Sequence, residues 1–193
     1  TNHTRLAEQI DGISADKEAG FSGFVPQSDG IDALASRLLL AERAEKSIDV
    51  QYYLIKNDLV GRTFVHSLLA AADRGVRIRL LVDDMFTSGY DTGLRALQSH
   101  PNFEIRIFNP FNRGAVGRTL GAVPSFGRIN RRMHNKTFTV DNSITIIGGR
   151  NIADEYFGAR EDSRFGDLDV IGIGPIVGDV ANMFDLYWNH ETA

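Results

Sequence analysis

The chain has 193 residues, of which 42% are hydrophobic and 24% charged, with no cysteine and a formal net charge of −4. Such a chain is long enough for one folded domain that needs neither a disulfide nor a structural metal, and it is not disordered. The missing cysteine excludes thiolate metal sites and cysteine nucleophiles, and the acidic balance argues against a dedicated nucleic-acid binder.

The first 55 residues contain one predicted helix and one predicted strand. Residues 1–27 show poor periodicity and are expected to form an irregular arm. Residues 30–46 predict a helix, with Ser28 or Asp29 as its N-terminal cap. The apolar face of this helix is expected to comprise Ile31, Leu34, Leu38 and Leu39. Residues 47–55 are rich in β-branched and aromatic side chains, as in a central strand.

Helices and strands then alternate along the chain. The pattern predicts a helix over 59–75, a strand over 76–84, a helix over 92–99, a strand over 103–108 and, near the C-terminus, a strand over 168–174 and a helix that opens with Pro175. This order predicts a single α/β domain over residues 1–193, with a largely parallel or mixed sheet covered by helices on both faces. Three aromatic residues are expected in the core: Tyr52, Tyr53 and Trp188.

A basic, glycine-rich stretch precedes the most informative part of the sequence. Residues 105–140 contain no acidic residue and seven basic ones. Their field would attract phosphate or an anionic lipid surface, which makes Arg128, Arg131 and Arg132 candidates for contact with lipid headgroups. The alternative is a solvated loop whose arginines pair with acidic residues elsewhere in the chain.

Two short apolar runs, 137–140 and 144–147, are separated by Asp-Asn-Ser and predict a β-hairpin. Because side chains two apart on a strand share a face, His134 and Lys136 are expected to project together. A turn centred between the Asp and the Asn would place Gly149 opposite His134. The missing Cβ would then leave room for a group to approach the imidazole.

These side chains suit a phosphoryl group. A neutral imidazole at His134 is a nucleophile toward phosphorus, and the ammonium of Lys136 supplies a point charge. The amide of Asn151, at the same end of the hairpin, supplies uncharged hydrogen bonds. The expected phosphate-binding residues are Lys136, Gly148, Gly149 and Asn151.

Nearby carboxylates have different expected roles. Asp141 lies at the far end of the hairpin, on the order of 20 Å from His134, and is expected to be a turn and packing residue. A neutral, oriented imidazole needs a partner for its other nitrogen. Asp167 and Asp169, at the start of the next strand, are both candidates, and Asp167 is favoured.

The spacing of His134, Lys136, Asp141, Gly148, Gly149 and Asn151 resembles the signature H-x-K-x4-D-x6-G-[GS]-x-N of the phospholipase D superfamily. By average residue frequencies, such a set would arise by chance on the order of a few times per million chains of this length. The likeness extends over nearly the whole chain from about Ile31. The segments "NRRMHNKTFTVD", "IIGGRNIADEYFG" and "DLDVIGIGPIVGDVANMF" resemble the N-terminal half of bacterial cardiolipin synthases.

The resemblance implies a phosphatidyl transfer that uses no metal and no cofactor. One motif histidine attacks the phosphodiester to give a phosphohistidine, and a second histidine protonates the departing alcohol. The expected substrates are phosphatidylglycerol and, as an alternative, phosphatidylethanolamine. The expected location is the membrane surface of a bacterium, on the cytoplasmic side, as a peripheral protein, since no run approaches the roughly 20 apolar residues of a membrane-spanning helix and no signal peptide is evident.

The sequence departs from the family pattern in one respect. The family's site is built from two copies of the motif, and no second H-x-K occurs in this chain. The chain is therefore expected to be the front half of a longer enzyme, or to pair with a second copy. Two other interpretations remain open: a single-motif homodimeric phosphodiesterase acting on nucleic acid, and a catalytically silent lipid-binding domain. Apolar residues among the arginines of the basic stretch favour lipid over nucleic acid.

Overall fold

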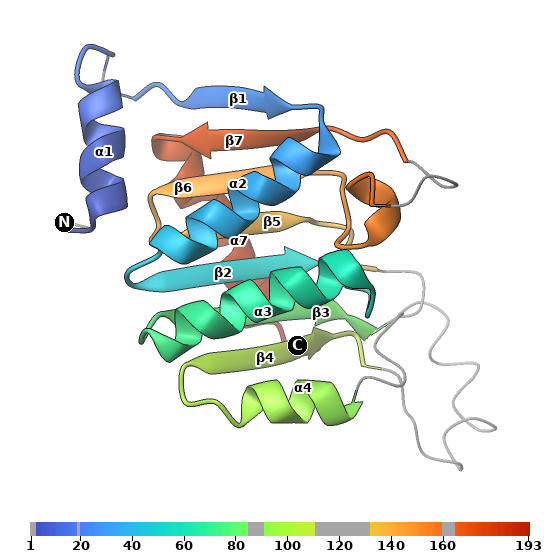
Figure 1. Cartoon of the computed structure of the whole chain (residues 1–193). Coiled ribbons are helices and arrows are strands. Elements are labelled where there is room, and N and C mark those ends of the chain that lie inside the picture. Colours follow the sequence, from blue (N-terminus) through green and yellow to red (C-terminus); the bar gives the residue numbers. More distant parts are fainter. Residues whose placement is uncertain (1–2, 19, 85–90, 111–131, 160–164) are drawn as a thin grey trace.

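A computed structural model describes residues 3–18, 20–84, 91–110, 132–159 and 165–193 of the chain. The described residues form a seven-stranded sheet with strand order β1-β7-β6-β5-β2-β3-β4 (Figure 1). The strands are β1 (Gly23–Gln27), β2 (Ser47–Tyr52), β3 (Arg77–Asp83), β4 (Phe103–Phe108), β5 (Thr137–Val140), β6 (Ile144–Gly148) and β7 (Asp169–Ile173).

The sheet is mixed, and its two halves follow from different parts of the sequence. Strands β2, β3 and β4 are parallel, as the alternation of strands and helices predicts. The β5–β6 hairpin pairs antiparallel with β2, and β7 and β1 continue the antiparallel half. The predicted fold class is confirmed in its mixed form.

The helices lie on both faces of this sheet. They are α1 (Arg5–Ser14), α2 (Gly30–Arg43), α3 (Leu59–Asp73), α4 (Asp91–Gln98), the short 3₁₀ helix η2 (Asp154–Tyr156) and α7 (Pro175–Trp188). Helices α2 and α3 cover one face and α7 covers the other (Figure 1). Asp29 caps α2 by accepting hydrogen bonds from the backbone N–H groups of Ile31 and Asp32. Among the described residues, no helix has the length and apolar character needed to cross a membrane.

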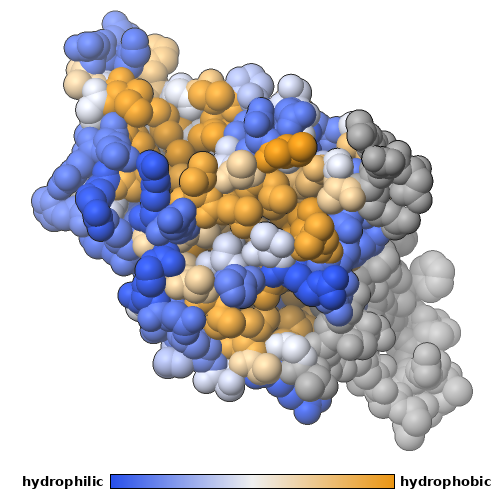
Figure 2. All heavy atoms as spheres, in the orientation of Figure 1, coloured by the Kyte–Doolittle hydropathy of each residue, from blue (hydrophilic) through white to orange (hydrophobic). Residues whose placement is uncertain are grey.

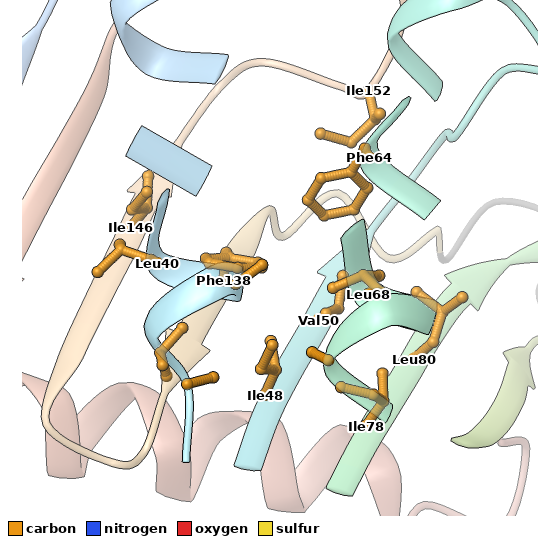
Figure 3. Close-up of a cluster of buried hydrophobic side chains, with 14 of the residues drawn as sticks. Leu40, Ile48, Val50, Phe64, Leu68, Ile78, Leu80, Phe138, Ile146 and Ile152 are labelled. Atoms are coloured by element: carbon orange, nitrogen blue, oxygen red, sulfur yellow. The ribbon is translucent and has the colours of Figure 1, made fainter. Parts of the chain in front are cut away.

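A hydrophobic core lies on each side of the sheet. Figure 3 shows the larger core, in which Phe64 and Leu68 of α3 and Leu40 of α2 pack against strand residues that include Ile48, Val50, Ile78, Leu80, Phe138 and Ile146. The smaller core lies under α7 and contains Leu81, Phe108, Met133, Phe184 and Trp188. The alternation of Leu80 and Leu81 between the two cores is the period of two expected of a strand covered on both faces.

The expected apolar face of α2 is wrong for Ile31 and Leu39, while Leu34 is partly buried and packs against the core. Ile31 is 67% exposed and Leu39 is 51% exposed. The helix instead buries Ala33, Arg37, Leu40 and Ala41. The buried position of Arg37 explains the difference, because hydropathy assigns an arginine to the solvent face unless its buried partner is known.

The expectation of an irregular arm over 1–27 is also wrong for its described residues. Helix α1 is capped by the hydroxyl of Thr4, which accepts from the N–H of Ala7 at 3.1 Å. Among the described strands, β1 lies at the edge of the sheet and pairs with β7, and its side chains are largely exposed. Because an exposed edge strand containing Pro26 needs no apolar alternation, the sequence carries no strand signal there.

Candidate active site

The β5–β6 hairpin places Lys136 opposite Gly148. Thr137 pairs with Ile147, one residue away from the predicted register, and the N–H of Gly148 donates to the carbonyl of Lys136 at 3.2 Å. The predicted pairing of Gly149 with His134 is therefore wrong. The turn contains three residues rather than two, and its first two have positive φ values, 50° and 49°.

Asp141, the first of these turn residues, fastens the hairpin to the start of β2. Its buried carboxylate accepts hydrogen bonds from the backbone N–H groups of Glu45, Lys46 and Ser47 at 2.8–3.0 Å. These bonds occupy the carboxylate at the end of the hairpin opposite the histidine. The structural role expected of Asp141 agrees with this geometry.

The paired glycines make room for two carboxylates of the neighbouring strand. A Cβ at Gly148 would collide with Asp169, and a Cβ at Gly149 would collide with the carboxylate of Asp167. The glycines therefore allow the start of β7 to lie directly against the end of the hairpin. Space opposite the histidine is not their function.

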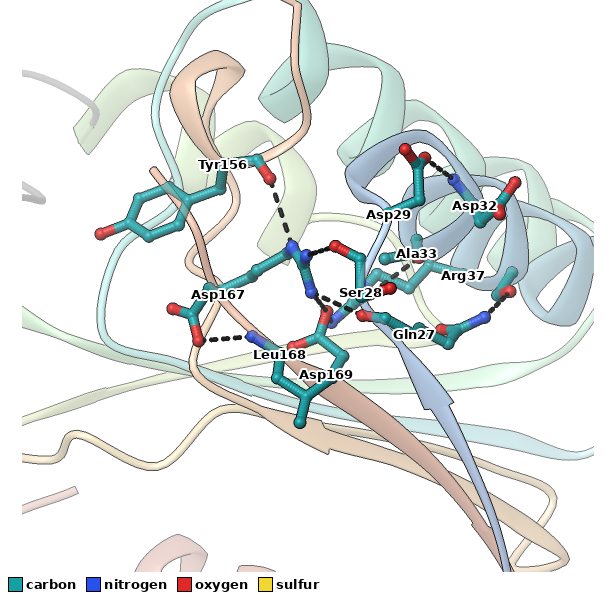
Figure 4. Close-up of polar contacts among 12 residues, drawn as sticks. Gln27, Ser28, Asp29, Asp32, Ala33, Arg37, Tyr156, Asp167, Leu168 and Asp169 are labelled. Atoms are coloured by element: carbon teal, nitrogen blue, oxygen red, sulfur yellow. Dashed lines mark hydrogen bonds and ion pairs between the residues drawn. The ribbon is translucent and has the colours of Figure 1, made fainter. Parts of the chain in front are cut away.

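Asp169 belongs to a buried network of arginines. Its carboxylate accepts from Arg37 at 2.8 Å and forms an ion pair with Arg150 at 3.4 Å. Arg37 also donates to the hydroxyl of Tyr52 at 2.9 Å, and burial raises the pKa of that hydroxyl, which therefore stays neutral. Figure 4 shows this network reaching Ser28 and Tyr156, whose carbonyls accept from Arg150. Asp169 is one of the two carboxylates that were expected to be able to pair with His134. It is already paired with Arg37 and Arg150.

His134, Lys136 and Tyr53 form one contact group at the end of the sheet. The exposed ring of His134 lies 4.4 Å from the ring of Tyr53, measured between centroids. The Nζ of Lys136 lies 5.8 Å from the centroid of Tyr53 and donates to the carbonyl of His134 at 2.6 Å. The two motif residues therefore project together, and an aromatic ring supports both.

Tyr53 is the site residue that sequence reasoning missed. Tyr52 and Trp188 lie in the core as expected, whereas Tyr53 is half-buried beside His134. The available signal was its position directly after β2, in the register opposite to that of Tyr52. A ligand-facing residue is common at the carboxyl end of a strand in an open α/β sheet.

The negative charge of Asp167 affects the pKa of the Lys136 ammonium. Burial lowers the pKa of the Lys136 ammonium, and the negative charge of Asp167 opposes that shift. One oxygen of Asp167 accepts from the N–H of Leu168 at 2.8 Å. The structure thus places this carboxylate within electrostatic reach of Lys136, and its predicted contact with His134 stays a prediction.

Asn151 lies beside the segment that carries Tyr53. The next residue, Ile152, forms a parallel bridge with Ile55, and its N–H donates to the carbonyl of Leu54 at 3.0 Å. The buried side chain of Asn151 donates to the hydroxyl of Tyr156 at 3.1 Å. Its own carbonyl oxygen is buried without a hydrogen-bond partner among the described residues. This oxygen is a hydrogen-bond acceptor, so only the N–H groups of the Asn151 amide are able to donate to a phosphate oxygen.

The residues just before His134 are fixed to the end of β3. The side chain of Arg132 is 8% exposed and donates to Asp83 at 3.0 Å, and the N–H of Met133 donates to the same carboxylate at 3.1 Å. For Arg132 the structure therefore matches the alternative of pairing with an acidic residue, not contact with lipid. The other two headgroup candidates, Arg128 and Arg131, lie outside the described residues.

Comparison with known proteins places this geometry in context. A family described as cardiolipin synthase, PLD-like domain, matches residues 39–188. Cardiolipin synthase C of Escherichia coli strain K12 is 54% identical over 169 residues, which are 88% of this chain and 36% of that protein. The chain spans about a third of the length of the curated relatives it matches.

Solved structures share the fold at low sequence identity. The phosphatidylserine synthase of Haemophilus influenzae Rd KW20 has a TM-score of 0.65 at 13% identity, over 96% of this chain and 42% of that chain. NucT from Helicobacter pylori has a TM-score of 0.63 at 12% identity, over 87% of this chain and 95% of that chain. At such identities the likeness concerns the fold alone.

Proposed function

The chain belongs to the cardiolipin synthase, PLD-like domain family, and from that premise we propose that it is one catalytic half of a phosphatidyltransferase that works through a phosphohistidine. The observation that carries the proposal is the contact group of His134 and Lys136 at the end of the hairpin. A nucleophile and a cation on one exposed rim suit a phosphodiester presented from outside the domain. The second half of the site would come from a further segment of the polypeptide or from a partner chain.

In the first step, the unprotonated ring nitrogen of His134 attacks the phosphorus of the phosphatidyl donor. The bond from phosphorus to the departing alcohol breaks, and that alcohol takes a proton from the histidine of the second motif. The ammonium of Lys136 and the amide of Asn151 bind the non-bridging oxygens, where negative charge gathers in the transition state. Asp167 would hold the remaining N–H of the imidazole or keep Lys136 charged.

In the second step, an acceptor hydroxyl attacks the phosphohistidine. The nitrogen–phosphorus bond breaks, His134 leaves as a neutral imidazole, and the hydroxyl proton passes to the second histidine. The exposure of His134 supports a shared site, because a phosphohistidine at this rim would be hydrolysed unless a second half covered it and excluded water.

The proposed substrates are phosphatidylglycerol and, as an alternative donor, phosphatidylethanolamine, met at the cytoplasmic surface of a bacterial membrane. The support for lipid is the family match and the 54% identity with a cardiolipin synthase. The basic residues of 105–140 other than Arg132, which is paired with Asp83, would add attraction to an anionic surface.

Two measurements on the complete natural polypeptide test the proposal. Mass spectrometry of lipids from expressing cells should show cardiolipin formation that His134→Ala abolishes. Incubation with 32P-labelled phosphatidylglycerol should trap an acid-labile adduct that the same substitution removes. His3→Ala, at an exposed histidine far along the chain from the motif, serves as the matched control and should retain both signals.

The rival functions give different results. Loss of single-stranded DNA cleavage in His134→Ala, with cell lipids unchanged, would favour the nucleic-acid phosphodiesterase. Lipid binding by the parent with no adduct under any condition would favour the silent lipid-binding domain.

A further inference from the structure

A cavity of about 520 Å³ lies between α3 and α4, over the ends of β2 and β3. Its volume falls within the roughly 300–1,000 Å³ of small-molecule sites. The walls are mainly aliphatic and include Val65, Leu69, Leu80, Val82, Leu94 and Leu97. Figure 2 shows apolar side chains gathered on this face of the molecule, with hydrophilic side chains around them.

The cavity adjoins the candidate active site through two of its lining residues. Tyr53 lines the cavity and also contacts the ring of His134 at 4.4 Å. Asp83 lines the cavity and holds Arg132 and the N–H of Met133, the two residues directly before that histidine. One end of the cavity is therefore a single aromatic ring away from the nucleophile.

Leu80 and Val82 at the floor of the cavity belong to the core, but the aliphatic side chains that the two helices contribute are only partly buried. On α3, Phe64 and Leu68 are fully buried against the sheet, whereas Val65 and Leu69 are only partly buried and line the cavity. Leu94 of α4 lines the opposite wall and is also partly exposed. Apolar surface left accessible in a concave site is favourably covered by an apolar ligand.

We propose that this cavity binds one acyl chain of the phospholipid whose phosphate reacts with His134. The inference rests on the proposed function and adds the site that recognises the lipid tail. The charged residues of the lining fit a chain that enters past a polar mouth: the side chain of Lys56 is 42% exposed and paired with Glu155, Arg62 is exposed, and Asp83 is paired with Arg132. A nucleobase is held mainly by stacking on aromatic rings, whereas most of this lining is aliphatic and its Tyr53 ring already packs against His134.

The test uses the complete natural polypeptide with short-chain phosphatidylglycerols below their micelle concentrations. Each methylene group that enters the cavity should strengthen binding roughly fourfold. The KM for the dioctanoyl donor should therefore be on the order of tenfold below that for the dihexanoyl donor. Val65→Trp, which fills the cavity from α3, should bring the two KM values within about threefold of each other by raising the KM for the dioctanoyl donor.

Two further variants secure the interpretation. Leu94→Trp fills the cavity from α4 and should act like Val65→Trp. Leu186→Trp adds the same ring at a 68% exposed position of α7, on the other face of the sheet, and should keep the parent's chain-length dependence. A dihexanoyl adduct in the two filling variants with unchanged chain-length dependence overturns the acyl-chain site while leaving the phosphohistidine intact. The absence of any lipid adduct in the parent overturns the proposed function and this inference together.

A measurement independent of turnover also decides the question. Phosphatidylglycerol with a diazirine at the end of an acyl chain, photolysed with the parent protein in mixed micelles, should label peptides of α3 and α4 around Val65 and Leu94. Labelling confined to other segments would contradict the site even if the Trp variants failed to fold.

Discussion

At the scale of single residues, the ring of Tyr53 contacts the side chains of both His134 and Lys136. Its ring contacts the imidazole of His134 and lies under the ammonium of Lys136. Burial raises the pKa of its hydroxyl, so the ring acts by packing and not by charge. Because small displacements of a reacting group cost up to about 10²-fold in rate, the position of the imidazole should depend on this ring.

We therefore expect Tyr53→Ala to lower kcat/KM for the dihexanoyl donor by on the order of 10²-fold, and Tyr53→Phe to stay within about threefold of the parent. The short donor is chosen because it depends least on the cavity that Tyr53 also lines. Adduct formation measured by rapid quench, with thermal unfolding as the control for folding, checks this. Equal losses in the Ala and Phe variants would show that the hydroxyl matters instead of the ring.

We expect the charge of Asp167 to set the alkaline limit of the proposed reaction. The proposed mechanism needs the Lys136 ammonium, whose pKa is lowered by burial and held up by Asp167. Asp167→Asn should lower this pKa further, so the alkaline limb of the pH–rate profile should move to lower pH. Asp179→Asn, at an exposed carboxylate of α7, is the matched control and should leave the limb in place. An unmoved limb in Asp167→Asn would contradict the assignment.

The contribution of Lys136 to the free energy of unfolding has the opposite pH dependence to its contribution to activity, in the same pH range. The folded pKa of Lys136 lies below that of the unfolded chain, so between these two values the unfolded chain binds more protons. The contribution of this lysine to the free energy of unfolding therefore rises with pH there, as the penalty of burying the ammonium is removed. Deprotonation of Lys136 at high pH should thus lower activity without destabilising the fold.

At the scale of elements, the hairpin and β7 meet through the two motif glycines. The Cβ added by Gly148→Ala would meet both the side chain and the Cα of Asp169, which two arginines hold in place. The Cβ added by Gly149→Ala would meet only the carboxylate of Asp167, a partly exposed group that can rotate away.

Gly148→Ala should accordingly lower the free energy of unfolding by about 3 kcal/mol, the upper part of the range for an overpacked site, and Gly149→Ala by less than about 1 kcal/mol. Urea denaturation of the two variants measures both values. Gly149→Ala should also shift the alkaline limb of activity, because it displaces Asp167. A larger stability loss at Gly149 than at Gly148 would disprove this account of the glycines.

The elements that sequence reasoning predicted well are those with strong local signals. The α3 and α7 helices, the parallel strands and the existence of the hairpin follow from periodicity, caps and turn residues. The register of the hairpin differs by one residue because a three-residue turn with two positive φ values has no distinct signature in Asp-Asn-Ser. The buried Arg37–Asp169 pair joins α2 to β7 across 132 positions, and no local pattern reveals such a pair.

In the candidate site, too, sequence predicts the residues that have a local signal and misses those that depend on long-range contacts. His134, Lys136 and Asn151 carry their chemistry in the spacing of the motif, so sequence finds them. The roles of Tyr53 and Asp167 depend on which strand ends lie together in space, and these follow from the sheet order rather than from neighbouring letters. The cavity between α3 and α4 was likewise hidden, since Val65 and Leu69 have the spacing of core residues.

At the scale of the whole molecule, the chain presents one exposed motif histidine and spans about a third of its curated relatives. The proposed mechanism needs a second histidine to protonate the departing alcohol. The isolated chain should therefore turn over phosphatidylglycerol on the order of 10²- to 10⁴-fold more slowly than the complete polypeptide, the usual contribution of a general acid. Turnover assays beside sedimentation velocity, which reports whether the chain is monomeric, measure the difference.

The extent to which the isolated chain is slower than the complete polypeptide should depend on the leaving group. A donor that releases p-nitrophenol needs no proton on the departing oxygen, so the isolated chain should form its phosphohistidine from such a donor with a much smaller deficit. His134→Ala should abolish this burst, and circular dichroism confirms that parent and variant are folded. Rapid turnover of phosphatidylglycerol by the isolated chain, at concentrations where it sediments only as a monomer, would show that residues 1–193 contain a complete site and that no second half is required.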